Sequence, residues 1–106
     1  MTHDITDQPR ALGWIDAELS LSVEWDRAGV ERLASRLGYR LVWPDEISVL
    51  PVSAQLQCIG ADTVLMPSSD HLDHAELRRV QEIADVETVN PRLSLPRRSV
   101  FAEDIR

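Results

Sequence analysis

Short apolar runs alternate along the chain with segments whose apolar residues recur at helical spacing. The clearest helical segment has four apolar residues on one face, at i, i+3, i+4 and i+7: Val30, Leu33, Ala34 and Leu37. Asp26 precedes this face as the expected N-cap, and Gly38 follows it as a stop signal. Four apolar runs predict buried strands, at residues 11–15, 40–43, 63–66 and 87–89.

Two further helices are predicted, one before and one after the third strand. Pro51 begins the first of them and Gly60 ends it. The second has three apolar residues on one face: Leu77, Val80 and Ala84. Residues 18–24 alternate between apolar and polar side chains, which fits a short strand or an ordered loop, and residues 92–106 have no clear period.

Strands that alternate with helices predict βαβ units, a mostly parallel sheet and helices on both of its faces. The length of 106 residues suits one domain of this kind. We therefore expect a single three-layer α/β domain with about four strands over residues 10–90. Residues 1–9 are expected to form a flexible N-terminal tail and residues 91–106 a C-terminal tail.

Polar residues follow the predicted strands, and the carboxyl ends of parallel strands meet at the edge where open α/β sheets bind ligands. Asp45, Glu46 and Asn90 belong to this edge, together with six candidate binding residues: Asp16, Glu18, Ser69, Asp70, His71 and His74. One interpretation is a divalent-metal or small-ligand site, with the two histidines one helical turn apart. The other is structural, with Ser69 or Asp70 as the N-cap of the third helix. No recognised metal or cofactor motif is present, and we expect no cofactor.

The charge and composition exclude several function classes. A formal net charge of -7 opposes nonspecific binding to phosphate backbones. All 11 basic side chains are arginine, which excludes a P-loop and any mechanism that needs a lysine Schiff base. The serines at residues 68 and 69 lack the flanking glycines of a hydrolase elbow. Cys58 is expected to be a buried, inert thiol, and the three tryptophans are expected to lie in the core or at an interface.

The chain is expected to be cytoplasmic and not to associate with a membrane. Its first residues lack the basic and apolar segments of a signal peptide. Its apolar runs are far shorter than the ~20 residues that a membrane helix needs.

Two segments resemble the catalytic domain of the serine recombinases, the resolvase and invertase family. Residues 13–18 read Gly-Trp-Ile-Asp-Ala-Glu, where members have roughly Gly-Tyr-x-Arg-x-Ser with the serine as nucleophile. Residues 60–66 read Gly-Ala-Asp-Thr-Val-Leu-Met and lead into Ser-Asp-His-Leu-Asp-His at 69–74, where members have Leu-Asp-Arg-Leu-x-Arg. With the order of elements, the resemblance covers about residues 10–90 and implies a resolvase-like, flavodoxin-like fold.

The same resemblance implies that the recombinase chemistry has been lost. Glu18 stands at the nucleophile position, Asp16 at one arginine position, and His71 and His74 at two others. Attack on a phosphodiester needs fixed cations on the phosphate oxygens, and carboxylates oppose it. We therefore expect a non-catalytic interaction or regulatory module, with no catalytic residues, that binds a protein partner or self-associates. DNA contact is expected to be weak or to go through a partner chain, and an accessory role in recombination remains an alternative.

Overall fold

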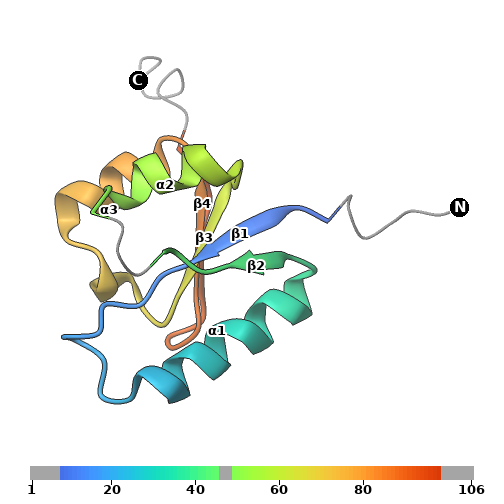
Figure 1. Ribbon diagram of the computed structural model, residues 1–106, viewed down its shortest axis with the longest axis vertical. Coiled ribbons are helices and arrows are strands. Elements are labelled where there is room, and N and C mark those ends of the chain that lie inside the picture. The colour runs from blue at the N-terminus through green and yellow to red at the C-terminus, as the bar shows by residue number, and fades with distance from the viewer. Residues whose placement is uncertain (1–7, 46–48, 99–106) are drawn as a thin grey trace, which may run out of the picture.

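The computed structural model describes residues 8–45 and 49–98, which form five strands, three α-helices and one 3-10 turn (Figure 1). Their order is β1 (Arg10–Gly13), α1 (Val23–Leu37), β2 (Arg40–Val42), α2 (Val52–Ile59), β3 (Thr63–Met66), η2 (Ser69–His71), α3 (His74–Gln81), β4 (Asp85–Thr88) and β5 (Leu93–Leu95). The four predicted strands and three predicted helices are all present. Glu46, which was assigned to the carboxyl edge, lies outside the described residues.

The strands form one sheet in the order β2-β1-β3-β4-β5. The first four are parallel, and β5 runs antiparallel to β4. The mostly parallel α/β sheet is therefore confirmed, but it has five strands rather than about four. The last strand lies in the segment expected to be a C-terminal tail, so the sheet extends beyond residue 90. A three-residue edge strand is too short to show a period, which is why the sequence pattern did not reveal it.

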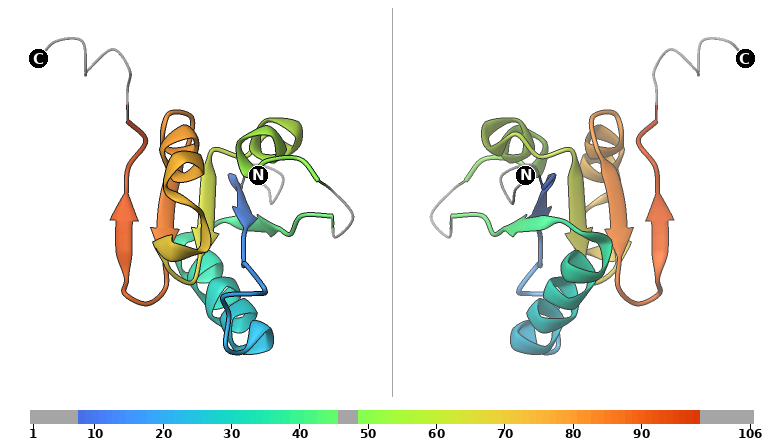
Figure 2. Two further views of the ribbon diagram at one scale, coloured as in Figure 1. Left: turned by 90° about the vertical axis from the view of Figure 1, so that its left-hand side faces the viewer. Right: turned by 90° about the vertical axis from the view of Figure 1, so that its right-hand side faces the viewer.

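The helices cover the sheet on both faces, as expected for a three-layer fold (Figure 2). On one face, Val30, Leu33 and Ala34 of α1 pack against Ala11 and Leu65. On the other, residues from α2 and α3 form a larger core with alternate strand residues: Leu12, Val52, Leu56, Val64, Met66, Val80 and Val86. The strand β3 is buried at every position because it lies between both layers.

Glycines end the first two helices as predicted, and α2 begins at Pro51 as predicted, but the N-cap of α1 is not the predicted residue. Gly38 and Gly60 adopt the left-handed conformation, with φ of 83° and 69°. The N-cap of α1 is Ser22, whose Oγ accepts a hydrogen bond from the Trp25 N–H at 3.2 Å, and Asp26 lies inside the helix. Residues 18–22 form a loop with turns, and the helix begins directly after it.

One expectation about burial is wrong. Cys58 is exposed, because it lies on the side of α2 that faces away from the core. Trp25 is 73% exposed on α1, whereas Trp14 and Trp43 pack against the two cores. In the part of the chain that the structure describes, no helix has the length and apolar character needed to cross a membrane.

Candidate functional site

The candidate site lies at the carboxyl ends of β1 and β3. From β1 the chain crosses to β2 on one side and then returns to β3 on the other, so the strand order reverses between β1 and β3. Open α/β sheets bind ligands outside such a reversal. Two cavities of about 360 and 370 Å³ open there. We call the one lined by residues of segment 19–32 the α1 pocket, and the one lined by the starts of α2 and α3 the α2 pocket.

His71 lies in the wall between the two pockets and joins two loops. Its Nδ1 accepts a hydrogen bond from the Asp16 N–H at 2.9 Å, and its carbonyl oxygen accepts one from Trp14 Nε1 at 2.9 Å. The side chain is buried, so these bonds are shielded from water. Because Nδ1 is an acceptor, the neutral ring carries its proton on Nε2. His71 therefore fixes the loop after β1 against the loop after β3.

The other candidate residues do not form one cluster around His71. Asp16 lies close to it through the backbone, and Asp70 lines the α1 pocket. Glu18 and His74 are exposed, and neither of them nor Ser69 lines the two pockets. The two histidines do not share a helix, because His71 ends the 3-10 turn and His74 begins α3.

The N-cap of α3 is Asp73 rather than Ser69 or Asp70. The Asp73 Oδ1 accepts a hydrogen bond from the Glu76 N–H at 2.8 Å. Ser69 and Asp70 lie in the 3-10 turn that separates β3 from this cap. The predicted cap is therefore wrong by three to four residues, because the sequence pattern did not reveal the 3-10 turn.

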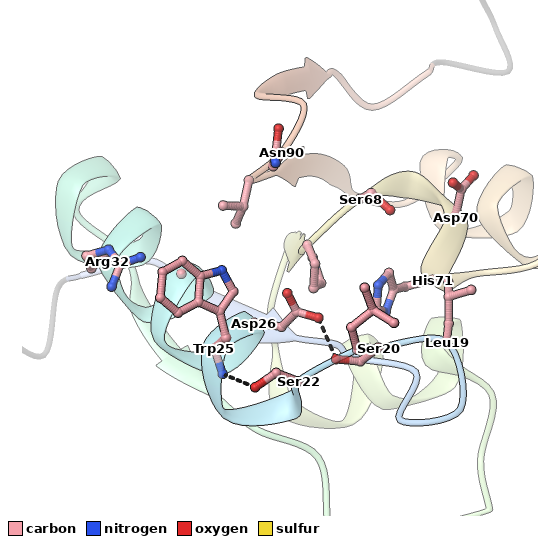
Figure 3. Close-up of a pocket in the computed structure, with 14 residues that line it drawn as sticks. Leu19, Ser20, Ser22, Trp25, Asp26, Arg32, Ser68, Asp70, His71 and Asn90 are labelled. Atoms are coloured by element: carbon pink, nitrogen blue, oxygen red, sulfur yellow. Dashed lines mark hydrogen bonds between the residues drawn. The ribbon is translucent and has the colours of Figure 1, made fainter.

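The α1 pocket contains a serine paired with a carboxylate. The Ser20 hydroxyl donates to Asp26 Oδ2 at 2.6 Å, which fixes the loop onto the first turn of α1 (Figure 3). A carboxylate that accepts a hydrogen bond from a hydroxyl can act as the general base that activates it as a nucleophile. Phosphoryl chemistry also needs cations, and Arg32 is the one guanidinium that lines this pocket within the described residues. The carboxylates of Asp26 and Asp70 line it too, so the pocket does not suit a phosphodiester.

Apolar side chains on the rim are the feature of the α1 pocket that the sequence did not reveal. Leu21 is fully exposed, Trp25 is 73% exposed and Leu19 is 48% exposed. All three line the same pocket, and we call them the Leu19–Trp25 patch. The alternation of residues 18–24 fitted a short strand or an ordered loop, and the structure shows the loop over residues 18–22. Exposed large apolar residues gathered on one concavity are typical of a protein contact surface.

The α2 pocket is polar at its base and structural in character. Glu76 is buried there, where Oε2 accepts from the Ser53 N–H and Oε1 accepts from Arg79 Nε, both at 2.9 Å. Burial by itself would raise the pKa of the Glu76 carboxyl, but these hydrogen bonds outweigh burial and lower the pKa. The charged carboxylate thus ties the start of α2 to α3.

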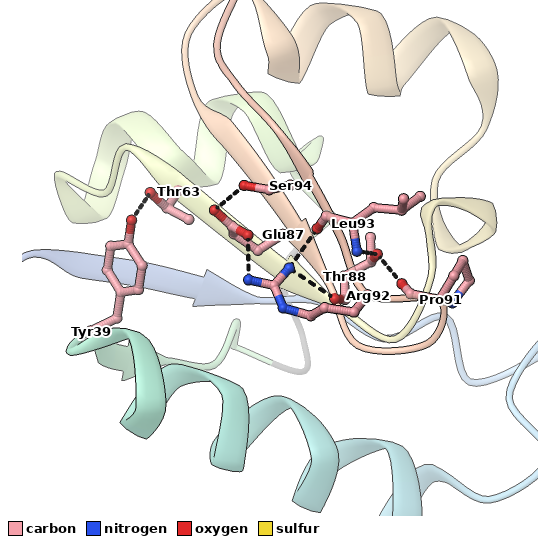
Figure 4. A network of polar contacts seen from close by, with 8 residues as sticks. All are labelled: Tyr39, Thr63, Glu87, Thr88, Pro91, Arg92, Leu93 and Ser94. Atoms are coloured by element: carbon pink, nitrogen blue, oxygen red, sulfur yellow. Dashed lines mark hydrogen bonds and ion pairs between the residues drawn. The ribbon is translucent and has the colours of Figure 1, made fainter.

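A second polar cluster lies on the α1 side of β4, away from both pockets (Figure 4). Glu87 stands beside Leu65 in the sheet and is only 13% exposed in its side chain. Its Oε1 lies 2.9 Å from Arg92 Nη2, an ion pair whose N–H does not point at the oxygen, and its Oε2 accepts from the Ser94 hydroxyl at 2.9 Å. These partners connect β4 to β5 and its preceding turn, so we assign the cluster a structural role.

The described residues show no candidate metal centre, and the comparisons with known proteins found no relative of the chain. Over residues 8–45 and 49–98, no three His, Cys, Asp or Glu side chains come together in an arrangement that could hold a metal ion. No family model matches the sequence, and the comparisons with curated proteins and with solved structures gave no match. The resemblance to the serine recombinases therefore stays a prediction.

Proposed function

We propose that this chain is a resolvase-like α/β domain without recombinase chemistry, and that it acts as a protein-interaction module through the Leu19–Trp25 patch. The observation that carries the proposal is the exposure of three large apolar side chains on one pocket, with Leu21 fully exposed and Trp25 at 73%. The free energy of the system falls when a partner covers large apolar side chains, because their surface is removed from water. Tryptophan is also the residue type most enriched among those that dominate binding energies.

The residues at the recombinase positions support a non-catalytic role. His71 and Asp16 are engaged with each other through a backbone hydrogen bond, and Glu18 and His74 are exposed. None of these residues supplies the fixed positive charge that stabilises a phosphorane-like transition state. Among the described residues, Arg32 is the one arginine that lines the α1 pocket, whereas recombinase chemistry would need several arginines.

The strand order supports the finer fold assignment. The order β2-β1-β3-β4-β5 is the flavodoxin-like order, the fold type that the recombinase resemblance implies. The fifth strand departs from a fully parallel sheet because it is antiparallel and follows β4 through a short turn. We propose the resolvase-like assignment on this order together with the two sequence segments.

In-cell photo-cross-linking tests the interaction role. A photoreactive phenylalanine analogue replaces Leu21 in one variant, and Glu82, which is exposed at the end of α3, in a matched control. We expect a discrete protein adduct from position 21 and none from position 82. Equal adducts from both positions, or no adduct at position 21, would contradict an interaction through the patch.

A DNA-trapping assay tests the absence of recombinase chemistry. The chain is incubated with supercoiled plasmid and quenched with detergent, and protein bound covalently to DNA is separated and sequenced. We expect neither relaxation of the plasmid nor an adduct. A serine-linked adduct would overturn the non-catalytic part of the proposal, and its attachment at Ser20 would identify the Ser20–Asp26 pair as the reacting group.

A further inference from the structure

Arg27 shows how this chain holds an arginine of its own. The Arg27 guanidinium lies 4.3 Å from the centre of the Trp43 ring, and its Nε lies 3.8 Å from Glu31 Oε2. An indole ring attracts a cation through its electron-rich face, and a carboxylate attracts it through charge and hydrogen bonds. Arginine suits both contacts at once, because its planar guanidinium stacks on a ring while its N–H groups point outward.

The α1 pocket presents the same two groups, a tryptophan ring and a carboxylate. Trp25 and Asp26 both line the pocket, and Trp25 is 73% exposed. The Asp26 carboxylate is half-buried, and its Oδ2 accepts a hydrogen bond from the Ser20 hydroxyl at 2.6 Å. Within the described residues, Asp26 Oδ1 has no hydrogen-bond or ion-pair partner. One oxygen therefore holds the carboxylate in place, and the other is open to a ligand.

Arg32 lines the same pocket but lies away from Asp26. A Cβ at Gly29 would lie 3.9 Å from Arg32 Nη2, so the guanidinium lies beside Gly29 on α1. Among residues 8–45 and 49–98 it forms no ion pair and no contact with an aromatic ring. In the view of Figure 3, Arg32 and Asp26 lie on opposite sides of the Trp25 ring. The side of the pocket next to Asp26 is therefore open to an arginine from another molecule.

The charge around the α1 pocket favours a basic partner. The two segments that contribute most of its lining, residues 16–32 and 68–74, hold seven acidic side chains and two arginines. The acidic side chains include Glu31 in the second half of α1, which lies beside Arg27. Two copies of a chain with a net charge of -7 repel each other, and a nucleic acid is repelled as well. A basic protein is attracted to this face and oriented by it.

We propose that the α1 pocket binds an arginine of a basic protein partner, with the guanidinium stacked on the Trp25 ring and paired with Asp26 Oδ1. Apolar side chains beside that arginine cover Leu19 and Leu21, which are exposed on the rim. The inference rests on the proposed interaction role and states which residue type the Leu19–Trp25 patch recognises. Arginine and tryptophan are the residue types that most often dominate the binding energy of an interface.

Two peptides that differ by one charge test the pocket. The probe is acetyl-Leu-Ser-Arg-Ser-Leu-amide, and its control carries citrulline, which has the shape of arginine without the charge. Each peptide is titrated to about 10 mM into the isotope-labelled chain and followed by NMR, a range that detects a dissociation constant of about 1 mM. We expect the arginine peptide to shift the Trp25 indole N–H and the Asp26 amide, and the citrulline peptide to bind at least tenfold more weakly. Equal shifts from both peptides, or no shift from either, would overturn the proposal.

Variants that remove one charge separate recognition in the pocket from general attraction. Asp26→Asn removes the charge and keeps an oxygen that accepts from Ser20, and it should weaken binding of the arginine peptide about tenfold. Glu24→Gln is the matched control, because Glu24 is exposed in the same first turn of α1 and does not line the pocket. It should weaken binding less than about twofold. Trp25→Leu keeps an apolar side chain, removes the ring and should weaken binding as Asp26→Asn does. Similar losses from Asp26→Asn and Glu24→Gln would overturn the proposal.

The cross-linking assay at position 21 separates this inference from the proposed interaction role. We expect the adduct to be lost in the Asp26→Asn chain and kept in the Glu24→Gln chain. An adduct that both variants keep overturns the arginine contact and leaves the interaction role in place. An adduct with twice the mass of the chain overturns the choice of a basic partner and also leaves that role in place. No adduct together with no peptide shift overturns both.

Discussion

His71 holds two loops together through different parts of one residue. Its ring accepts a hydrogen bond from the Asp16 backbone, and its own backbone accepts one from the Trp14 indole. A buried N–H that loses its acceptor keeps its desolvation penalty, so the ring matters more than its single bond suggests. His74, three residues later, is exposed and forms no side-chain hydrogen bond or ion pair within the described residues.

Substitution of His71 should therefore lower the stability, whereas substitution of His74 should hardly change it. His71→Leu removes the acceptor for the Asp16 N–H and should lower the free energy of unfolding by about 1–3 kcal/mol. The Trp14 bond survives because it goes to the backbone. His74→Ala is the matched control and should change the free energy by less than about 0.5 kcal/mol. Urea denaturation at neutral pH measures both, and equal effects would contradict the structural role of His71.

Position 13 requires glycine because of close packing and not because of its backbone conformation. A Cβ at this position would lie 2.7 Å from a ring carbon of Trp43, while no positive φ is involved. Gly13→Ala should therefore lower the free energy of unfolding by about 1–3 kcal/mol through overpacking. Trp43→Leu in the same chain should recover part of that loss by making room. Thermal denaturation measures both, and a Gly13→Ala variant as stable as the wild type would show that the Trp43 ring can move aside.

At the scale of elements, the ends of helices divide into those that the sequence predicts and those that it does not. Gly38 and Gly60 end their helices because glycine adopts a left-handed conformation at little cost. An N-cap depends on where the preceding loop brings an oxygen, and several serines and aspartates qualify by type. Asp26 was predicted as the N-cap of α1. The Ser22 hydroxyl oxygen instead accepts the hydrogen bond from the Trp25 N–H, so Ser22 is the cap and Asp26 lies within the helix.

The assignment of the α1 cap can be tested directly. Ser22→Ala should lower the free energy of unfolding by about 1 kcal/mol, because the Trp25 N–H loses its acceptor. Ser35→Ala is the matched control, since Ser35 is exposed within the same helix and alanine favours helix. It should leave the stability unchanged or raise it by a few tenths of a kcal/mol. Chemical denaturation followed by far-ultraviolet circular dichroism measures both, and similar losses would point to a different cap.

The link between α2 and α3 should depend on pH. The pKa of Glu76 is lowered in the folded chain, so its charged form stabilises the fold above the ordinary value of about 4.5. This stabilisation is lost as the pH falls below that value and through the lowered pKa. Glu76→Gln should therefore be less stable than the wild type at pH 7, by about 1 kcal/mol, and the difference should shrink in acid. Urea denaturation at a series of pH values measures it, and a difference that stays constant would contradict the role of the charge.

The strands show which part of the fold follows from sequence and which part needs three dimensions. Thr63–Met66 was predicted at its observed bounds, because a strand covered on both faces is apolar at every position. The antiparallel β5 was missed, because three residues are too few to show a period and because Arg92 and Ser94 meet Glu87 only across the folded sheet. Such pairings over the sheet have no signature along the chain.

At the scale of the whole molecule, the site is assembled from segments that are far apart in the sequence. The parallel topology fixes the carboxyl edge where the sequence predicted a site, and His71 lines both of the pockets that open there. Trp25 and Arg32 were not predicted as part of it, because they reach the α1 pocket from the side of a helix and not from a strand end. The exposure of Leu19 and Leu21 beside them follows from the loop path of residues 18–22, which only the folded chain defines.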